Sequence, residues 1–349
     1  MLLDGKRIVI TGGTGSLGKV LVRRLLSCEL GKPEKIIVFS RDEAKQHFMR
    51  LEYLHRQSAT DEVIYRNFQE LLTFRIGDVR DYHSVASVMR EADVVFQAAA
   101  LKQVPTCEYF PFEAVQTNIL GAENIVRAIK ENDLPISTVV GVSTDKACKP
   151  VNVMGMTKAI QERIFINANL ECSKTRFICV RYGNVLASRG SVIPLFHDQI
   201  RIGGPVTITT AEMTRFLLSL DQGVDTIFAA LKGAKKGETY IPRIKSAKVV
   251  DVADVLIGNR PIKKVFTSVR PGEKIHEILV SEEEVHRTVV RSNDYYTIKP
   301  ILPELMVNSN GEQKLTKEFS SADNLMTKDE LEVLLKTHHL MVDDKIAYE

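Results

Sequence analysis

The sequence predicts an α/β protein in which helices cover both faces of a doubly wound parallel sheet. Two observations lead to this prediction. Short runs rich in β-branched residues alternate with longer amphipathic stretches through the first half of the chain, and a glycine-rich turn directly follows the first run. Strands separated by helical stretches imply crossover connections, which produce a parallel sheet that is buried on both faces.

The strands expected in the first half are short and apolar. They span Arg7–Thr11, Lys35–Phe39, Thr73–Ile76, Val94–Ala98, Thr138–Val142 and Phe177–Arg181. The helices between them are expected to begin near Ser16, Asp42, Asp81, Phe112 and Asn152. This order is typical of a Rossmann-type domain, which we assign to residues 1–182 with contributions from later segments.

The second half is less regular, and we expect residues 183–300 to form a smaller, substrate-binding lobe. Helices are expected near Ser191–Arg201, Gln222–Leu231 and Val249–Ile257, and short strands near Val206–Ile208, Thr239–Ile241 and Val265–Ser268. Residues 301–349 form a C-terminal extension. In it, Thr327 and Glu330 make a capping box for a terminal helix over Asp329–His338.

Composition argues against several classes of protein. The 47 Lys and Arg residues balance 44 Asp and Glu, which does not favour nucleic-acid binding. No apolar run approaches the ~18 residues of a membrane span, and Met1–Gly5 lacks the layout of a signal peptide. The 5 cysteines include no C-x-x-C pair, and the 8 histidines no H-E-x-x-H motif. We therefore expect a cytoplasmic protein with no disulfide framework, metal site or membrane contact.

The turn after the first expected strand predicts a dinucleotide site. Its glycines have the spacing G-x-x-G-x-x-G, which lets the backbone approach a pyrophosphate at the start of a helix. The strand–turn–helix order favours this function over an ordinary glycine-rich turn. The residues expected to bind here are Gly12, Thr14, Gly15, Ser16, Leu17 and Gly18.

The end of the second expected strand predicts NADP rather than NAD. An acidic residue there binds the adenosine ribose, whereas a basic residue suits the 2′-phosphate. After Ser40 the first charged residue is Arg41, and Lys45 follows one helical turn later. The alternative is that both cations are solvated and Asp42 binds the ribose.

Two further strand ends are expected to contact the coenzyme. Asp78 and Val79 follow the third strand, where Asp78 either binds the adenine amino group or merely starts a helix. At the end of the fourth strand and just after it, the expected residues are Ala98, Ala99, Ala100 and Lys102. Lys102 can equally face a sugar or be structural.

The clearest chemical signal follows the fifth expected strand, which leads into Thr144, Asp145 and Lys146. Doubly wound folds place their ligands at the carboxyl ends of strands, so these side chains are candidates for catalysis. The alternative is that they only cap the strand and begin a turn. Lys158 follows Met154 by one helical turn at the start of the next helix.

Several sequence motifs resemble those of the extended short-chain dehydrogenase/reductases. Within that family they resemble the bacterial UDP-N-acetylglucosamine 4,6-dehydratases of capsule, flagellin-glycan and nonulosonic-acid pathways. They are Ala98-Ala-Ala-Leu-Lys102-Gln-Val-Pro105, Ser143-Thr-Asp-Lys-Ala147, Arg181-Tyr-Gly-Asn184, Ser188-Arg-Gly-Ser-Val-Ile-Pro194, Met213-Thr-Arg-Phe216 and Arg270-Pro-Gly-Glu-Lys274. The resemblance covers roughly Asp4 to Ile298. Met154 stands where the family's Tyr-x-x-x-Lys has tyrosine, as it does in one capsule-type branch.

The resemblance implies dehydration of the sugar, with an internally recycled NADP and with or without inversion at C5. Hydride would leave C4, Lys146 would remove the C5 proton, Asp145 would protonate the departing 6-hydroxyl, and hydride would return to C6. Thr144 would bind the 4-hydroxyl and Lys158 the nicotinamide ribose. Lys146 then needs a pKa lowered from about 10.4 toward neutrality, and Asp145 a raised one.

Methionine cannot carry a proton, so Met154 leaves the base for the 4-hydroxyl open. Asp145, Lys146 and Lys102 acting through water are the candidates. Two other functions also stay open. A nucleotide-sugar 4-epimerase has no role for the Asp145–Lys146 pair, and an inactive NADP-binding regulatory protein is the alternative that Met154 favours.

The resemblance also implies a UDP-sugar site and a homo-oligomer, either a dimer or a hexamer. The substrate-binding residues would be Lys102, Asn184, Val192, Ile193, Pro194, Arg215, Arg270 and Glu273. Asn184 and the two arginines would bind the diphosphate. The free backbone amides of residues 192–194 would bind phosphate or uracil, and Glu273 would bind the ribose. Each arginine can instead be a surface charge or an ion-pair partner.

Overall fold

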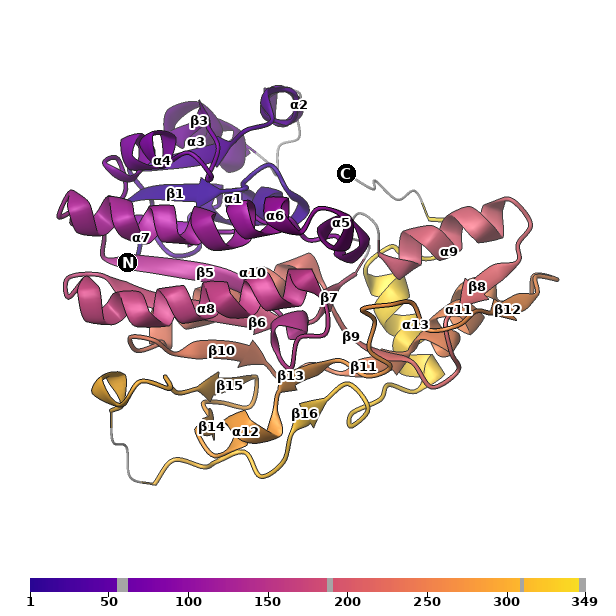
Figure 1. Ribbon diagram of the computed structural model, residues 1–349. Helices are drawn as coiled ribbons and strands as arrows, with labels where there is room; N and C mark the ends of the chain where they lie inside the picture. The colour runs from indigo at the N-terminus through magenta and orange to yellow at the C-terminus, as the bar shows by residue number, and fades with distance from the viewer. Residues whose placement is uncertain (55–61, 187–190, 308–310, 345–349) are drawn as a thin grey trace.

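The computed structural model describes residues 1–54, 62–186, 191–307 and 311–344. Its centre is a nine-stranded sheet with the order β14-β15-β10-β6-β5-β4-β1-β2-β3 (Figure 1). These strands are β1 (Arg7–Thr11), β2 (Lys35–Ser40), β3 (Leu72–Ile76), β4 (Val94–Gln97), β5 (Thr138–Thr144), β6 (Arg176–Tyr182), β10 (Thr239–Pro242), β14 (Thr288–Val290) and β15 (Tyr295–Ile298). The strands from β3 through β10 are parallel, and β15 and β14 add an antiparallel edge. The predicted Rossmann-type α/β fold is confirmed.

Helices cover both faces of this sheet. On one face lie α1 (Ser16–Leu26), α2 (Glu43–Leu54), α3 (Glu62–Leu71) and α10 (Leu220–Gly233), and on the other α4 (Tyr82–Met89), α7 (Gly121–Glu131) and α8 (Val153–Glu171). In β1, Ile8 and Ile10 pack on the first face and Val9 on the second, all fully buried. Successive strand residues point to opposite faces, so the unbroken apolar run is the signature of a strand that is covered twice.

A smaller cluster lies beyond the carboxyl ends of the parallel strands (Figure 1). It contains α9 (Val192–Arg201), β8 (Val206–Ile208), α11 (Val249–Ile257), β12 (Lys264–Phe266) and α13 (Lys328–Thr337). Phe196, Leu256 and Leu331 meet in its own apolar core. A three-stranded sheet of β11 (Ser246–Lys248), β9 (Thr214–Leu218) and β7 (Asn184–Val185) accompanies it, and β12 pairs with β8.

Short elements complete the described chain. They are α5 (Val104–Tyr109), α6 (Pro111–Ala114), the π-helical turn η2 (Val115–Leu120), the 3-10 turn η3 (Asp145–Ala147), β13 (Ile278–Val280), α12 (Glu282–Val285), the 3-10 turn η4 (Pro303–Leu305) and β16 (Phe319–Ser320). Strand β13 pairs with β16. This pairing ties the C-terminal extension to the segment that precedes α12.

Most of the predicted elements are confirmed with small shifts at their ends. The terminal helix begins at Lys328 with the predicted capping box on Thr327. Strands β14 and β15 escaped prediction because each is only three or four residues long and depends on pairing at the sheet edge. The chain thus returns to the main sheet after residue 238, while the boundary at 182/183 stays a prediction.

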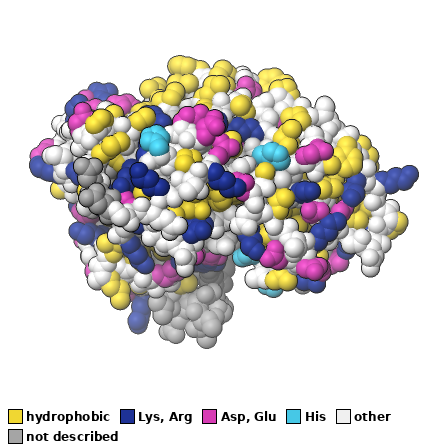
Figure 2. All heavy atoms as spheres, turned by 90° about the horizontal axis from the view of Figure 1, so that it is seen from below, with side chains coloured by type: hydrophobic (Ala, Val, Ile, Leu, Met, Phe, Trp, Pro, Cys, Tyr) yellow, Lys and Arg dark blue, Asp and Glu magenta, His cyan; other side chains and the backbone are white. Residues whose placement is uncertain are grey.

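The surface has no marked excess of either charge on the face seen in Figure 2. Basic and acidic side chains are interspersed there, in keeping with 47 Lys and Arg against 44 Asp and Glu. Within the described ranges, no helix combines the length and apolarity that crossing a membrane requires.

Candidate active site

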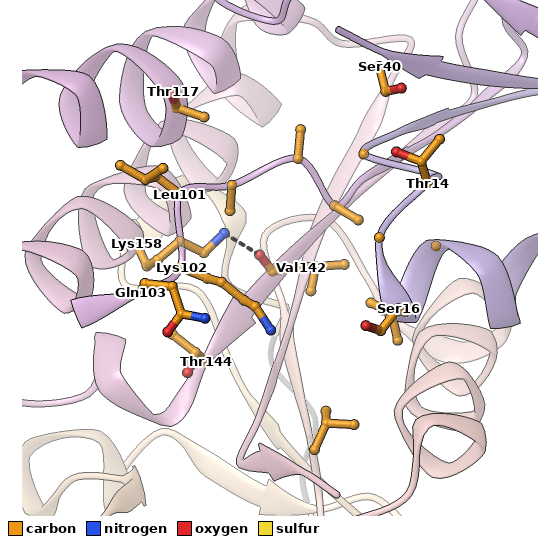
Figure 3. Close-up of a pocket in the computed structure, with 18 of the residues that line it drawn as sticks. Thr14, Ser16, Ser40, Leu101, Lys102, Gln103, Thr117, Val142, Thr144 and Lys158 are labelled. Atoms are coloured by element: carbon orange, nitrogen blue, oxygen red, sulfur yellow. Dashed lines mark hydrogen bonds between the residues drawn. The ribbon is translucent and has the colours of Figure 1, made fainter. Parts of the chain in front are cut away.

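A cleft of about 620 Å³ runs along the carboxyl ends of the parallel strands. Every residue expected to bind the coenzyme lines it: Gly12, Thr14, Gly15, Ser16, Leu17, Gly18, Ser40, Arg41, Lys45, Asp78, Val79, Ala98, Ala99, Ala100, Lys102 and Lys158. Figure 3 shows Thr14, Ser16 and Ser40 on one side of the cleft and Lys102, Thr144 and Lys158 on the other. The cleft therefore has a glycine-turn half and a half that carries the candidate chemistry.

The glycine turn is too tight for side chains. Gly12 has φ +67°, and a Cβ there would lie 2.7 Å from the amide nitrogen of Ala99. A Cβ on Gly18 would lie 2.5 Å from the Cα of Gly13, inside the turn. Helix α1 begins at Ser16 with no side-chain cap and no acidic residue in its first turn. Its free N–H groups and positive end thus suit an anionic diphosphate, and the turn fits a dinucleotide.

Arg41 and Asp42, the two candidates that the sequence offers for contact with the adenosine ribose, both line the cleft. Asp42 is already engaged: its Oδ1 accepts from the Lys45 amide at 3.0 Å, and its Oδ2 lies 2.7 Å from Lys45 Nζ. Arg41 remains 59% exposed, with Nη1 3.8 Å from Asp78 Oδ2. Burial raises the pKa of Asp78, but the hydrogen bonds from Arg80 lower it more, and the net shift of the pKa is downward. An exposed guanidinium therefore lies on the wall of the cleft, directly after β2.

The turn after β5 brings Thr144, Asp145 and Lys146 together. Asp145 is fully buried, and its Oδ1 accepts from Thr144 Oγ1 at 2.9 Å and from Lys146 Nζ at 3.0 Å. Lys146 Nζ also donates to Asn184 Oδ1 at 3.2 Å. Thr144, Lys146 and Asn184 line the cleft, whereas the buried Asp145 does not and contacts it through Thr144 and Lys146. Asp145 Oδ2 is buried with no hydrogen-bond partner among the described residues.

Helix α8 holds this turn through Gly155, which sequence reasoning missed. Asn152 caps the helix by accepting from the Gly155 amide at 2.8 Å. A Cβ on Gly155 would collide with the carbonyl oxygen of Lys146. The glycine after Met154 is thus the local signal for close docking of the turn on the helix.

Helix α8 carries Met154 and also Lys158, which lies on the same side of the cleft as Thr144 (Figure 3). Lys158 Nζ donates to the Val142 carbonyl at 2.6 Å (Figure 3) and to Gln161 Oε1 at 2.7 Å. Burial lowers the pKa of Lys158 to about 8. Met154 lines the cleft but packs in a small apolar cluster with Cys107 and Ala114. The thioether fills space next to the cleft, and no protonatable group replaces the family's tyrosine hydroxyl at this position.

The expected lowering of the Lys146 pKa is wrong for this structure. Burial pushes the pKa down, but the carboxylates of Asp145 and Glu277 push it up more strongly, and the net shift is upward. Glu277 Oε1 lies 3.4 Å from Lys146 Nζ. Sequence reasoning missed Glu277 because it is far from Lys146 along the chain.

The expected substrate residues are only partly brought together. Lys102 and Asn184 line the cleft, as does Ser191 at the start of α9. The residues Val192, Ile193, Pro194, Arg215, Arg270 and Glu273 do not, and their roles stay predictions. Arg215 Nη1 instead donates to the Thr214 and Ile275 carbonyls at 2.7 and 3.1 Å. The start of the Ser188–Pro194 phrase, up to residue 190, lies outside the described residues.

Further lining residues were not singled out from the sequence. They are Phe39, Gly77, Leu101, Gln103, Thr117, Val142, Ser143, Tyr182, Gly183, Val185 and Leu220. Thr117 lies in the π-helical turn η2, a distortion that often marks functional sites. Its neighbour Asn118 accepts from the Leu101 amide at 2.8 Å and donates to Thr157 Oγ1 at 2.9 Å. Among the described residues, no group of three or more His, Cys, Asp or Glu side chains could hold a metal ion.

The sheet order and the glycine-lined cleft define a Rossmann-type protein of the extended short-chain dehydrogenase/reductase class. The chain belongs to the polysaccharide biosynthesis protein family, whose model matches residues 8–300. This match confirms the family resemblance seen in the sequence.

Two curated relatives and one solved structure are similar over most of their length. A UDP-N-acetylglucosamine 4,6-dehydratase (inverting) from Campylobacter jejuni is 41% identical over 335 residues, which are 93% of this chain and 94% of the relative. A UDP-glucose 4-epimerase from Rickettsia bellii is 43% identical over 303 residues, 85% and 84% of the two chains. The crystal structure of Pen from Bacillus thuringiensis has a TM-score of 0.86 and 33% identity, covering 98% of this chain and all of that one.

Proposed function

We propose that the protein is a UDP-N-acetylglucosamine 4,6-dehydratase, a hydro-lyase that makes a UDP-2-acetamido-2,6-dideoxy-hexos-4-ulose for a bacterial surface polysaccharide or glycan. The observation that carries this proposal is the Asp145–Lys146 pair, whose Oδ1 and Nζ lie 3.0 Å apart beside the cleft. An acid and a base in contact at one end of a dinucleotide cleft suit removal of water from a sugar. The name of the Campylobacter jejuni relative supports the same reaction.

In the proposed mechanism, each side chain has one task. A bound nicotinamide coenzyme supplies the hydride acceptor and donor. Neutral Lys146 takes the C5 proton and passes it to the Asp145 carboxylate, whose Oδ1 lies 3.0 Å from Nζ, and Asp145 gives that proton to the departing 6-hydroxyl. Thr144 orients the 4-hydroxyl from the same turn, and Lys158 holds the coenzyme ribose. Met154 packs beside them and moves no proton.

The proposed coenzyme is NADP, bound by the residues named above for the cleft. Arg41 would pair with the 2′-phosphate, with Lys45 adding positive charge. Two observations support this choice over NAD: Arg41 is exposed at the end of β2, and Asp42 already caps α2 and pairs with Lys45. A guanidinium matches phosphate geometry well.

The proposed substrate is a UDP-sugar in the other half of the cleft, with Lys102 and Asn184 against it. Arg215, Arg270, Glu273 and the start of α9 (192–194) are proposed for its diphosphate, ribose and uracil. Inversion at C5 is part of the proposal because the Campylobacter jejuni relative is named as inverting. It requires reprotonation on the opposite face of the sugar.

A nucleotide-sugar 4-epimerase is the second candidate, because the Rickettsia bellii relative has that name. An epimerase needs oxidation and reduction only at C4. It leaves the Asp145–Lys146 pair without a task, and we therefore rank it second.

We also propose a homo-oligomer, either a dimer or a hexamer, in the cytoplasm. Tyr109, Phe110 and Phe112 around α5 and α6 are 83%, 59% and 65% exposed, which supports association through an apolar surface. Light scattering coupled to gel filtration would give the number of subunits. A monomer at micromolar concentration would contradict this part of the proposal.

The function is tested by incubating the purified protein with UDP-N-acetylglucosamine and NADP and measuring the mass of the product by mass spectrometry. The proposal predicts loss of one water, and NMR of the product then gives the C5 configuration. An unchanged mass with a changed C4 configuration would establish the epimerase instead. Tight NADP binding without turnover would support the regulatory alternative.

A further inference from the structure

The charged cluster around Lys146 contains a buried side chain that the proposed chemistry does not use. Glu277 is 3% exposed and precedes β13, and its Oε1 is 3.4 Å from Lys146 Nζ. Asp145 Oδ1 lies 3.0 Å from the same nitrogen, so two carboxylates flank one ammonium group. Arg215 Nε, 4.0 Å from Glu277 Oε1, is the second cation of the cluster.

Both backbone polar groups of Glu277, its N–H and its C=O, form hydrogen bonds with Ser321. Its amide donates to Ser321 Oγ at 2.9 Å, and its carbonyl accepts from the Ser321 amide at 2.8 Å. Ser321 Oγ also lies 2.6 Å from Thr214 Oγ1 on β9. The C-terminal extension therefore fixes the direction in which the Glu277 side chain approaches the catalytic turn.

Burying this cluster costs more free energy than burying an ion-pair network in which every oxygen accepts a hydrogen bond. Glu277 Oε2 and Asp145 Oδ2 are both buried without a hydrogen-bond partner in the described part of the chain. A buried carboxylate oxygen without a donor costs free energy, and such groups in native proteins are typically explained by function.

The groups that face Lys146 come from several elements. Asp145 belongs to its own turn, Glu277 to the segment before β13 and Arg215 to β9. Helix α8 also packs on the turn, but its Lys158 is bonded to Val142 and Gln161. Asp145 and Glu277 raise the pKa of Lys146 against burial and the repulsion of Arg215, both of which lower it.

We propose that Glu277 is a positioning residue, which holds Lys146 beside Asp145 and sets the pH at which Lys146 can accept a proton. Glu277 acts through Lys146 and does not line the cleft. The inference rests on the proposed dehydratase activity, in which Lys146 is the base at C5. It adds that the base is protonated in the resting site and that a residue from the second half of the chain controls its proton.

Glu277→Gln tests the proposal because it removes the charge and keeps the shape. Activity rises with pH as Lys146 loses its proton, so a lower Lys146 pKa moves the rising limb of the kcat/KM profile to lower pH. We expect a shift of about one pH unit. Glu277→Asp, which keeps the charge, should move the limb less. Glu282→Gln is the matched control, since Glu282 is 74% exposed and pairs with Lys149.

A second experiment measures the pKa of Lys146 directly and does not depend on turnover. Competitive acetylation across pH, followed by mass spectrometry of the Lys146 peptide, gives its pKa in wild type and Glu277→Gln. A lowered pKa in the variant without any dehydration by the wild type would retain the inference and remove the proposed function. Dehydration with an unmoved limb and an unmoved Lys146 pKa would overturn the inference alone. A fall in melting temperature and plateau rate with no pH shift would assign Glu277 a structural role instead.

Discussion

The two halves of the cleft are built in different ways. The glycine-turn half comes from consecutive strand ends in the first hundred residues, and every residue expected there lines it. The chemical half joins a turn after β5, Asn184 on β7 and Glu277 before β13, which are far apart in the chain. A site formed by consecutive loops can be predicted locally, whereas a site assembled across the fold depends on tertiary packing.

The largest effect is expected from breaking the chemical half alone. Asp145→Asn and Lys146→Ala should each lower product formation at least about 100-fold, because each removes a proton-transfer group. NADP affinity, measured by fluorescence titration, should stay unchanged. Lys149→Ala is the control, since this lysine is paired with Glu318 and Glu282 on the surface. Substantial turnover by either catalytic variant would remove the assigned role.

Paired glycine substitutions should separate the two halves. Gly18→Ala places a Cβ 2.5 Å from the backbone of the coenzyme turn, which must shift, and should weaken NADP binding by at least about tenfold. Gly155→Ala pushes on the Lys146 carbonyl and should lower kcat while NADP binding is retained. Gly223→Ala, where a Cβ meets only ordinary contacts at 3.4 Å, is the control. The same loss of NADP affinity in both variants would contradict the division.

The difference between the halves also explains what the sequence could predict. The β1 run, the glycine spacing, the helix start near Asp81 and the capping residue Thr327 are local signals, and the structure places them as expected. Glu277 has no local signal that ties it to Lys146, so the direction of the Lys146 pKa shift was predicted wrongly. Gly155 did have a signal, a glycine in the first turn of a capped helix, but its meaning depends on the turn that packs there.

Coenzyme choice tests the half that was easier to predict. Arg41→Ala should weaken NADP binding by about tenfold and leave NAD binding unchanged, because only NADP offers a 2′-phosphate to the guanidinium. Isothermal titration with both coenzymes measures this. Asp42→Asn provides the opposing test. If it weakens NAD binding while Arg41→Ala leaves NADP untouched, Asp42 binds the ribose and the choice of NADP is wrong.

The last prediction concerns the stability of the folded protein and Lys158, which lies in the chemical half of the cleft (Figure 3). Its pKa is about 8 in the folded protein and 10.5 ordinarily, so above pH 8 the unfolded chain holds a proton that the folded protein has lost. Stability therefore rises with pH in this window. The free energy of unfolding of wild type minus Lys158→Met should increase by about 1 kcal/mol per pH unit from pH 8 toward pH 10. Urea unfolding of the coenzyme-free proteins measures it, and a constant difference would refute the lowered pKa.

Turnover of UDP-N-acetylglucosamine in deuterated water tests most directly whether Asp145 and Lys146 strip water from the sugar. NMR of the product from the wild-type protein should show a 6-deoxy-4-keto sugar with solvent deuterium at C5, and Lys146→Ala should give none of it. Recovery of a C4 epimer with its original hydrogen at C5, or deuterated product from Lys146→Ala, would contradict the account.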